Sequence, residues 1–131
     1  MRELHRPMRR ILIIDDEDDI REVAALSLEA IAGWEILTAS SGAEGMVIAA
    51  AQQPDAIIMD VMMPKVDGPT TFGLIKQNPA ICNIPVLLLT AKVQGVDQRR
   101  FANLGVSGVL LKPFDPLTLS KQISDALGWK D

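Results

Sequence analysis

The sequence predicts an α/β fold of five βα units, (βα)5, with a doubly wound, parallel, five-stranded sheet. Five short apolar runs rich in branched residues recur along the chain, and a segment with helical periodicity follows each one. Most of these runs are continuous rather than alternating, which is typical of strands buried on both faces of a parallel sheet. The length of 131 residues fits one domain. We expect this domain at residues 10–128, with a basic N-terminal tail at 1–9 and a short C-terminal tail at 129–131.

Composition and charge exclude several classes of protein. Hydrophobic residues make up 48% of the chain and charged residues 23%, which indicates a globular domain rather than a disordered one. The net charge of −4 argues against nonspecific binding to nucleic acid. No apolar stretch approaches the roughly 18 residues of a membrane span, and the N-terminal residues do not support a secretory signal, so we expect a cytoplasmic protein. The lone Cys82 and the lone His5 exclude a disulfide framework, a cysteine zinc site and a Ser–His or Cys–His catalytic pair.

The strands and the first two helices are predicted from apolar patterns. We expect strands at residues 11–14, 35–39, 56–59, 86–89 and 109–111. The first helix ends at Gly33, and its apolar face consists of Ile20, Val23, Ala24, Leu28 and Ile31. Ser41 and Glu44 form a capping-box pattern at the start of the second helix. The apolar positions that follow at helical spacing are Ala43, Met46, Val47, Ala50 and Ala51.

Prolines and glycines indicate the other three helices. The third begins near Pro69 and ends before Pro79, and the fourth occupies about residues 95–104. The last begins with Asp115 as N-cap and Pro116 as its first helical residue. Its expected buried stripe consists of Leu119, Ile123, Ala126 and Leu127.

Polar residues follow four of the predicted strands. The first strand is followed by Asp15 and Asp16, the third by Asp60, the fourth by Thr90 and the fifth by Lys112. Ligands of open α/β sheets bind outside the carboxyl ends of the strands. In the flavodoxin-like strand order 2-1-3-4-5 the first and third strands are neighbours, so the three carboxylates converge. Together with the lysine they have a net charge of −2, which favours one divalent cation, and oxygen ligands favour Mg²⁺. A carboxylate beside such an ion can attack phosphorus and form an acyl phosphate.

Each of these residues also has an ordinary structural interpretation. Asp15 and Asp16 could only complement a helix dipole, and Asp60 could cap a turn. Thr90 could be a strand-end hydroxyl and Lys112 a solvated strand-end lysine. The functional interpretation depends on their joint placement at the ends of four strands.

Four segments resemble the receiver domain of two-component response regulators. They are residues 11–17 (ILIIDDE), 59–68 (MDVMMPKVDG), 87–91 (LLLTA) and 110–114 (LLKPF), and the resemblance extends from about Arg10 to Leu127. One position departs from the family, because Val109 stands where most receivers have Tyr or Phe. The resemblance therefore leaves the aromatic part of the receiver switch open in this chain.

The resemblance implies a function for each site residue. Asp60 would be the phosphoacceptor, taking a phosphoryl group from a phosphohistidine on a sensor histidine kinase or a histidine phosphotransfer protein. Thr90 and Lys112 would bind the phosphoryl oxygens, and the peptide bond between Lys112 and Pro113 would be cis. Met62 and Lys92 would flank the path of the hydrolytic water. The implied ligands of Mg²⁺ are Asp15, Asp16, Asp60 and the backbone carbonyl of Met62.

The resemblance also implies partners. A receiver is a phosphorylation-switched signalling domain rather than an enzyme, and its downstream protein target would bind the face formed by the fourth helix, the fifth strand and the fifth helix. A phosphorylation-dependent homodimer is a further possibility, whereas direct binding to nucleic acid or to a membrane is not expected. The chain is expected to be either a stand-alone regulator, which we favour, or a receiver excised from a larger protein.

Three other classes are weighed against the receiver. A flavodoxin-like FMN protein needs a Ser/Thr/Gly-rich phosphate loop after the first strand, whereas residues 15–19 are all acidic and would repel a phosphate in the absence of a metal. A haloacid-dehalogenase-type phosphatase needs an Asp-x-Asp motif that begins directly after this strand, where the chain has Asp15-Asp16-Glu17 instead. A phosphorylation-independent interaction module would lack some of the acidic residues, and none is missing.

Overall fold

The computed structural model describes residues 8–63, 67–91, 99, 101 and 103–130. Its sheet contains five parallel strands in the order β2-β1-β3-β4-β5, which confirms the predicted topology. The strands are β1 (Arg10–Ile14), β2 (Glu35–Ala39), β3 (Ala56–Asp60), β4 (Val86–Thr90) and β5 (Gly108–Leu111). Their bounds lie within one residue of the predicted ones, because continuous apolar runs mark strands with two buried faces.

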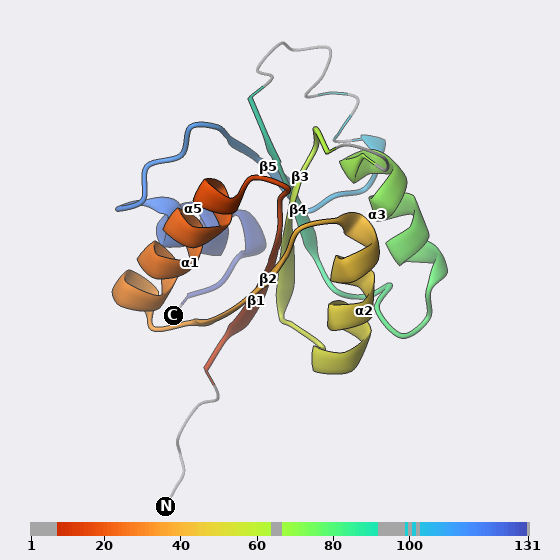
Figure 1. The fold of residues 1–131 in the computed structure, drawn as a ribbon, viewed down its shortest axis with the longest axis horizontal. Coiled ribbons are helices and arrows are strands. Elements are labelled where there is room, and N and C mark those ends of the chain that lie inside the picture. Colours follow the sequence, from red (N-terminus) through yellow and green to blue (C-terminus); the bar gives the residue numbers. More distant parts are fainter. Residues whose placement is uncertain (1–7, 64–66, 92–98, 100, 102, 131) are drawn as a thin grey trace, which may run out of the picture.

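Helices cover both faces of the sheet. The helices are α1 (Asp18–Ala32), α2 (Gly42–Gln52), α3 (Gly68–Gln77) and α5 (Leu119–Leu127). Figure 1 shows α1 and α5 on one face and α2 and α3 on the other. Arg99, Phe101 and Asn103 are helical, but the rest of the predicted helix at residues 95–104 falls largely outside the described residues. The described part of the chain therefore shows four complete helices and part of the predicted fourth one. No helix in the described part of the chain is long and apolar enough to cross a membrane.

The two faces of the sheet bury separate hydrophobic clusters. Along β1, Ile11 and Ile13 pack into the cluster that includes Leu28 of α1 and Ile123 of α5. Leu12 and Ile14 pack into the cluster on the opposite face. Residues alternate between the two faces of a strand, so a continuous apolar run supplies both layers. This packing holds the strand ends rigidly in position.

The buried face of α2 differs from the predicted one. The structure buries Gly42, Gly45 and Ala49, whereas Val47 of the predicted stripe is 70% exposed. Ala43, Ala50 and Ala51 of that stripe are also exposed. The reason is the close approach of the helix: a Cβ atom on Gly45 would lie 2.3 Å from Cδ1 of Ile14. Glycine does not count as apolar in a hydrophobic pattern, so the pattern identified the wrong face.

The C-terminal end of α1 and the N-terminal end of α2 largely follow the sequence. Gly33 ends α1 with a left-handed backbone, although Val23 and Ile31 of the predicted apolar face are exposed. The Oγ atom of Ser41 accepts a hydrogen bond from the Glu44 backbone N–H at the start of α2. In a capping box the Glu44 carboxylate would accept from the backbone N–H of Ser41. Here it accepts from the backbone N–H and the hydroxyl of Ser40, one residue earlier.

The start of the last helix corrects the sequence prediction. Helix α5 begins at Leu119 with Thr118 as its N-cap residue, three residues after the predicted cap. Asp115 instead forms a turn: its Oδ1 atom accepts from the backbone of Leu117 and its carbonyl oxygen accepts from Thr118. Of the predicted stripe, Leu119 and Ile123 are buried, Leu127 is half-buried and Ala126 is exposed.

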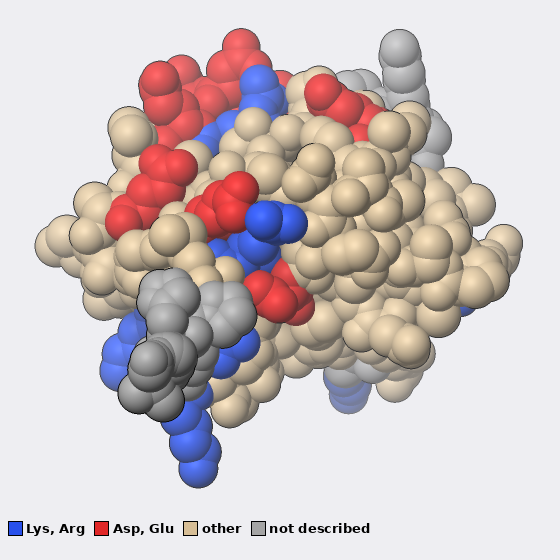
Figure 2. All heavy atoms as spheres, turned by 90° about the horizontal axis from the view of Figure 1, so that it is seen from below, with Lys and Arg blue, Asp and Glu red and all other residues tan. Residues whose placement is uncertain are grey.

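Aromatic and basic side chains lie at the N-terminal edge of the sheet. The rings of Trp34 and Trp129 meet edge to face, with their centroids 5.6 Å apart. The Arg9 guanidinium lies 3.9 Å from the centroid of the Trp129 ring. Figure 2 views the molecule from this edge and shows few charged side chains on the side of α2 and α3, each of which contains one charged residue. The amino edge of the sheet therefore carries an aromatic pair that contacts a guanidinium group.

Candidate functional site

The predicted site residues meet at the C-terminal edge of the sheet. Asp15 follows β1, Asp60 and Thr90 end β3 and β4, and Lys112 follows β5. Carboxylate oxygens of Asp15, Asp16 and Asp60 lie within 4.8 Å of one another. Asp15 is fully buried, Asp60 is 3% exposed, Thr90 is buried and Asp16 is exposed. The parallel register that pairs β1 with β3 brings these carboxylates together.

Backbone contacts explain the position of Asp60. The backbone N–H of Val61 donates to the carbonyl of Leu89 on β4, and Gly68 N–H donates to the carbonyl of Val61. The start of α3 lies so close that a Cβ atom on Gly68 would be 2.6 Å from the Asp60 carbonyl oxygen. Asp67 caps the helix, since its side chain accepts from the backbone of Thr70 at 2.8 Å. The loop after β3 is therefore anchored at both of its described ends.

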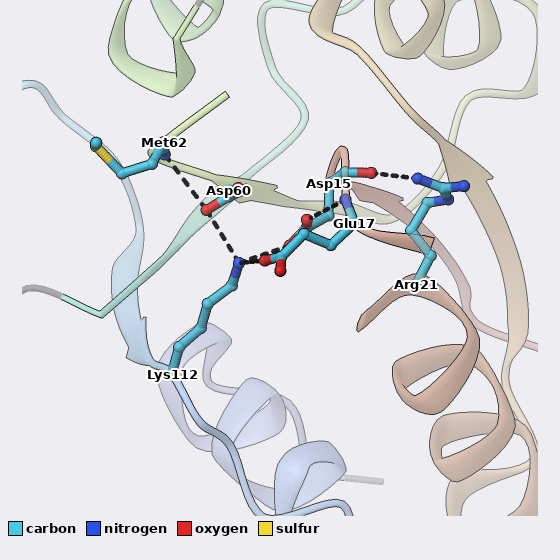
Figure 3. Close-up of polar contacts among 6 residues, drawn as sticks. All are labelled: Asp15, Glu17, Arg21, Asp60, Met62 and Lys112. Carbon is cyan, nitrogen blue, oxygen red and sulfur yellow. Dashed lines mark hydrogen bonds and ion pairs between the residues drawn. The ribbon is translucent and has the colours of Figure 1, made fainter. Parts of the chain in front are cut away.

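Lys112 lies at the centre of the acidic residues. Its ammonium nitrogen is 2.9 Å from Oδ2 of Asp15 and 3.2 Å from Oδ1 of Asp60 (Figure 3). It is also 3.2 Å from Oε1 of Glu17. The Lys112 backbone N–H donates to the carbonyl of Thr90, and the following peptide bond to Pro113 is cis. One ammonium group thus contacts three carboxylates.

The pKa values of Asp60 and Lys112 are both raised, for different reasons. Burial is the main cause that raises the pKa of Asp60, the negative charge of Asp15 adds to it, and Lys112 opposes it, which leaves a pKa of about 6. Burial would lower the pKa of Lys112, but the hydrogen bonds and charges of Asp15 and Asp60 outweigh burial and raise it. At neutral pH the site therefore contains a charged ammonium and an ionised Asp60 that is costly to keep charged.

Two residues that the sequence analysis did not single out contact the site. Glu17 pairs with Lys112, and its backbone N–H donates to Oδ1 of Asp15 at 2.9 Å. Arg21 donates from Nη1 to the Asp15 carbonyl oxygen at 2.6 Å and also pairs with Asp18. Arg21 could have been identified from the sequence by its position one turn into α1, which places a long side chain beside the end of β1. The sequence evidence for Glu17 was weaker, since it is only an acidic residue directly after the two aspartates.

The donor set fits a hard divalent cation. Oδ2 of Asp15 is buried, and among the described residues its polar partner is the Lys112 ammonium at 2.9 Å. Three convergent carboxylates with one exposed member leave room for the water ligands that Mg²⁺ retains.

The backbone N–H of Met62 donates to Oδ1 of Asp60 at 3.3 Å, and the Met62 side chain points away from the site and is 64% exposed. Lys92 lies outside the described residues.

Comparison with known proteins identifies the family. The family model of the response regulator receiver domain matches residues 11–124, which is most of the chain. The chain belongs to the response regulator receiver domain family. This membership decides against the flavodoxin-like and phosphatase alternatives, and it agrees with the convergence of the acidic residues.

Relatives of this receiver domain come from several bacteria. It is 41% identical to the DNA-binding dual master transcriptional regulator RpaA of Synechocystis, over 82% of this chain and 44% of that protein. It is 34% identical to the alkaline phosphatase synthesis transcriptional regulatory protein PhoP of Bacillus subtilis, over 91% of this chain and 48% of PhoP. The chain thus spans about half the length of these curated relatives. The chemotaxis protein CheY4 of Vibrio cholerae has a similar structure, with a TM-score of 0.84, 31% identity and coverage of 92% of this chain and 99% of CheY4.

Proposed function

We propose that Asp60 accepts a phosphoryl group from a phosphohistidine. The observation that carries this proposal is the buried Asp60 carboxylate, 3.2 Å from the Lys112 ammonium and within a cluster of three carboxylates. One carboxylate oxygen of Asp60 forms a bond to phosphorus while the phosphorus–nitrogen bond of the phosphohistidine breaks and its electrons return to the imidazole nitrogen. The product is an acyl phosphate on Asp60. With a pKa of about 6, the carboxylate is mostly ionised at neutral pH and available as the nucleophile.

The neighbouring residues would bind the transferred group. Lys112 provides a positive charge for the phosphoryl oxygens, and the raised pKa of its ammonium keeps that charge at neutral pH. Thr90 ends the strand next to Asp60 and is buried there, so its hydroxyl is a suitable donor for another phosphoryl oxygen. The ion pair of Lys112 with Asp60 and the burial of Thr90 on the neighbouring strand support these roles.

Asp15, Asp16, Asp60 and the backbone carbonyl of Met62 would hold Mg²⁺. When bound, the ion would offset the repulsion among the carboxylates and stabilise the charge on the phosphoryl oxygens. Asp15 suits this role because its buried Oδ2 has no polar partner among the described residues besides the Lys112 ammonium. Asp16 is exposed and could bind the ion from the solvent side.

The partners would be those of a signalling domain. The donor would be a sensor histidine kinase or a histidine phosphotransfer protein. The output would be a protein target on the face around β5 and α5, where Leu104, Leu111 and Leu117 are exposed although they are large and apolar. A phosphorylation-dependent homodimer could use the same face. RpaA and PhoP are named as transcriptional regulators, but the net charge of −4 of this chain does not favour direct binding to nucleic acid.

Intact-protein mass spectrometry tests the phosphoacceptor. The wild-type protein, incubated with acetyl phosphate and Mg²⁺, is expected to gain the mass of one phosphoryl group, and Asp60→Asn is expected to gain none because an amide is not nucleophilic. Asp55→Asn is the matched control, since it changes an aspartate on the opposite edge of the sheet. Labelling of Asp60→Asn at the wild-type rate would refute the assignment.

A further inference from the structure

The Glu17 side chain is directed away from its own helix. Glu17 is the N-cap residue of α1, yet its side chain makes no capping hydrogen bond. Its Oε1 atom instead accepts a hydrogen bond from the Lys112 ammonium at 3.2 Å, across 95 residues of sequence. A side chain at an N-cap usually accepts from the backbone of the first helical turn. The position of this carboxylate is therefore set by Lys112 and not by the helix.

The Lys112 ammonium has three protons and contacts three carboxylates. An ammonium group donates at most three hydrogen bonds, and Asp15, Glu17 and Asp60 each place an oxygen within 3.2 Å of it. A phosphoryl group on Asp60 adds further oxygens that need the same ammonium. At least one existing contact must then lengthen or break.

The three carboxylates differ in how easily each can lose its contact with the Lys112 ammonium. Asp15 is fully buried, and its other oxygen accepts from the backbone of Glu17. Asp60 is the residue that would carry the phosphoryl group. The Glu17 side chain is 61% exposed, and within the described residues its carboxylate has no partner besides Lys112. Water can replace this contact, and the released carboxylate stays at the N-terminus of α1, where the helix dipole favours a negative charge.

We propose that Glu17 is a positioning residue that competes with the phosphoryl group for Lys112. This proposal rests on the proposed function of Asp60. In the unphosphorylated protein Glu17 occupies the outward-facing donor of the ammonium, and phosphorylation requires its release. The Glu17–Lys112 ion pair thus favours the unphosphorylated state and sets how tightly the site holds a phosphoryl group. Removing the pair should tighten binding by about two- to fivefold, which is the worth of an exposed ion pair.

Binding of beryllofluoride, a phosphoryl analogue, provides the test. Its dissociation constant would be measured by calorimetric titration at a Mg²⁺ concentration that saturates each variant. Glu17→Gln removes the charge and is expected to bind about two- to fivefold more tightly than wild type. Glu17→Asp keeps the charge but is one methylene shorter and is a favoured N-cap residue, so it should turn to its own helix and bind more tightly as well.

A matched control separates the contact from the general field of the acidic residues. Asp19→Asn removes one negative charge from the exposed first turn of the same helix without touching the Lys112 contact. It should change the dissociation constant much less than Glu17→Gln does. An equal effect of Asp19→Asn, or wild-type affinity of Glu17→Asp, would refute the competition and leave only a charge effect. Wild-type affinity of both Glu17 variants would refute it as well.

The outcome for wild type distinguishes this proposal from the proposed function. If wild type gains a phosphoryl group on Asp60 and the Glu17 variants bind beryllofluoride as wild type does, only the role of Glu17 is wrong. If wild type gains no phosphoryl group and binds no beryllofluoride, the proposed function fails, and the role of Glu17 fails with it. Thermal unfolding of each variant shows whether Glu17 also contributes to the stability of the fold.

Discussion

At the scale of single residues, Asp60 is the group whose chemistry depends most on its surroundings. Burial and the charge of Asp15 raise its pKa to about 6, whereas an aspartate in the unfolded chain titrates near pH 4. Between these two pH values the folded protein binds more protons than the unfolded one. The free energy of unfolding therefore falls as the pH rises through this window. The carboxylate proposed as the nucleophile thus destabilises the metal-free fold at neutral pH.

The pH dependence of stability tests this view. Without divalent cations, the unfolding free energy of wild type relative to Asp60→Asn is expected to fall by up to about 3 kcal/mol between pH 4 and pH 7. The difference isolates Asp60 because the other titrating groups are shared by both proteins. Urea denaturation at a series of pH values measures it. A difference that does not change with pH would show that ionisation of Asp60 does not lower the free energy of unfolding.

At the scale of elements, glycines determine how closely α2 approaches its neighbours. A Cβ atom on Gly42 would lie 2.3 Å from Oγ1 of Thr71, on the facing side of α3. Thr71 is buried, and its hydroxyl makes no hydrogen bond to any described residue. The contact between these helices is therefore tight, and it is not held by a polar interaction of this hydroxyl.

Substitutions at this contact should be coupled. Gly42→Ala is expected to destabilise the protein by about 1–3 kcal/mol through overpacking, and adding Thr71→Ala should recover part of that loss by removing the two nearest atoms. Gly73→Ala on α3 is the control: a Cβ atom there meets nothing within 4 Å, so it should stabilise the helix by up to about 1 kcal/mol. Urea denaturation of the single and double variants measures the coupling. Additive losses from Gly42→Ala and Thr71→Ala would contradict the steric explanation.

At the scale of the whole molecule, the parallel sheet separates two kinds of edge. The carboxyl ends of the strands gather three carboxylates and one lysine, while the amino ends carry the Trp34, Trp129 and Arg9 contacts. Acidic groups held within 4.8 Å of one another repel. The stability of the whole domain should therefore depend on what binds at the carboxyl edge.

Magnesium should raise the melting temperature of the wild-type protein. A ligand at 100 times its dissociation constant adds about 2.7 kcal/mol to the stability of the folded state. Replacing Asp15 and Asp16 together by Asn keeps the side-chain shapes and removes the charge of two of the proposed ligands, so the double variant should show little or no shift. Differential scanning calorimetry with and without Mg²⁺ measures both proteins. A wild-type shift no larger than that of the double variant would argue against a metal site at these residues.

The sequence predicted strands and strand ends better than helix faces. Continuous apolar runs such as Ile57-Ile58-Met59 mark strands buried on two sides, and the topology of a parallel sheet then places Asp60 and Thr90 at one edge. The face of α2 was wrong because Gly42 and Gly45 pack closely without being apolar. The contact between Glu17 and Lys112 joins residues 95 positions apart through two flexible side chains. No local pattern encodes such a contact, so only the three-dimensional structure identifies it.

The aromatic contacts at the amino edge have a spectroscopic consequence. Trp34 and Trp129 are the two tryptophans of the chain, and they contact each other beside Arg9, on the opposite edge of the sheet from the carboxylates. Indole emission depends on groups and water in the immediate surroundings of the ring. The intrinsic fluorescence of this protein should therefore follow whether the segment after α5 stays packed against Trp34. It should not respond directly to an ion bound beside Asp60, so local release of the C-terminal segment can be observed separately from ligand binding.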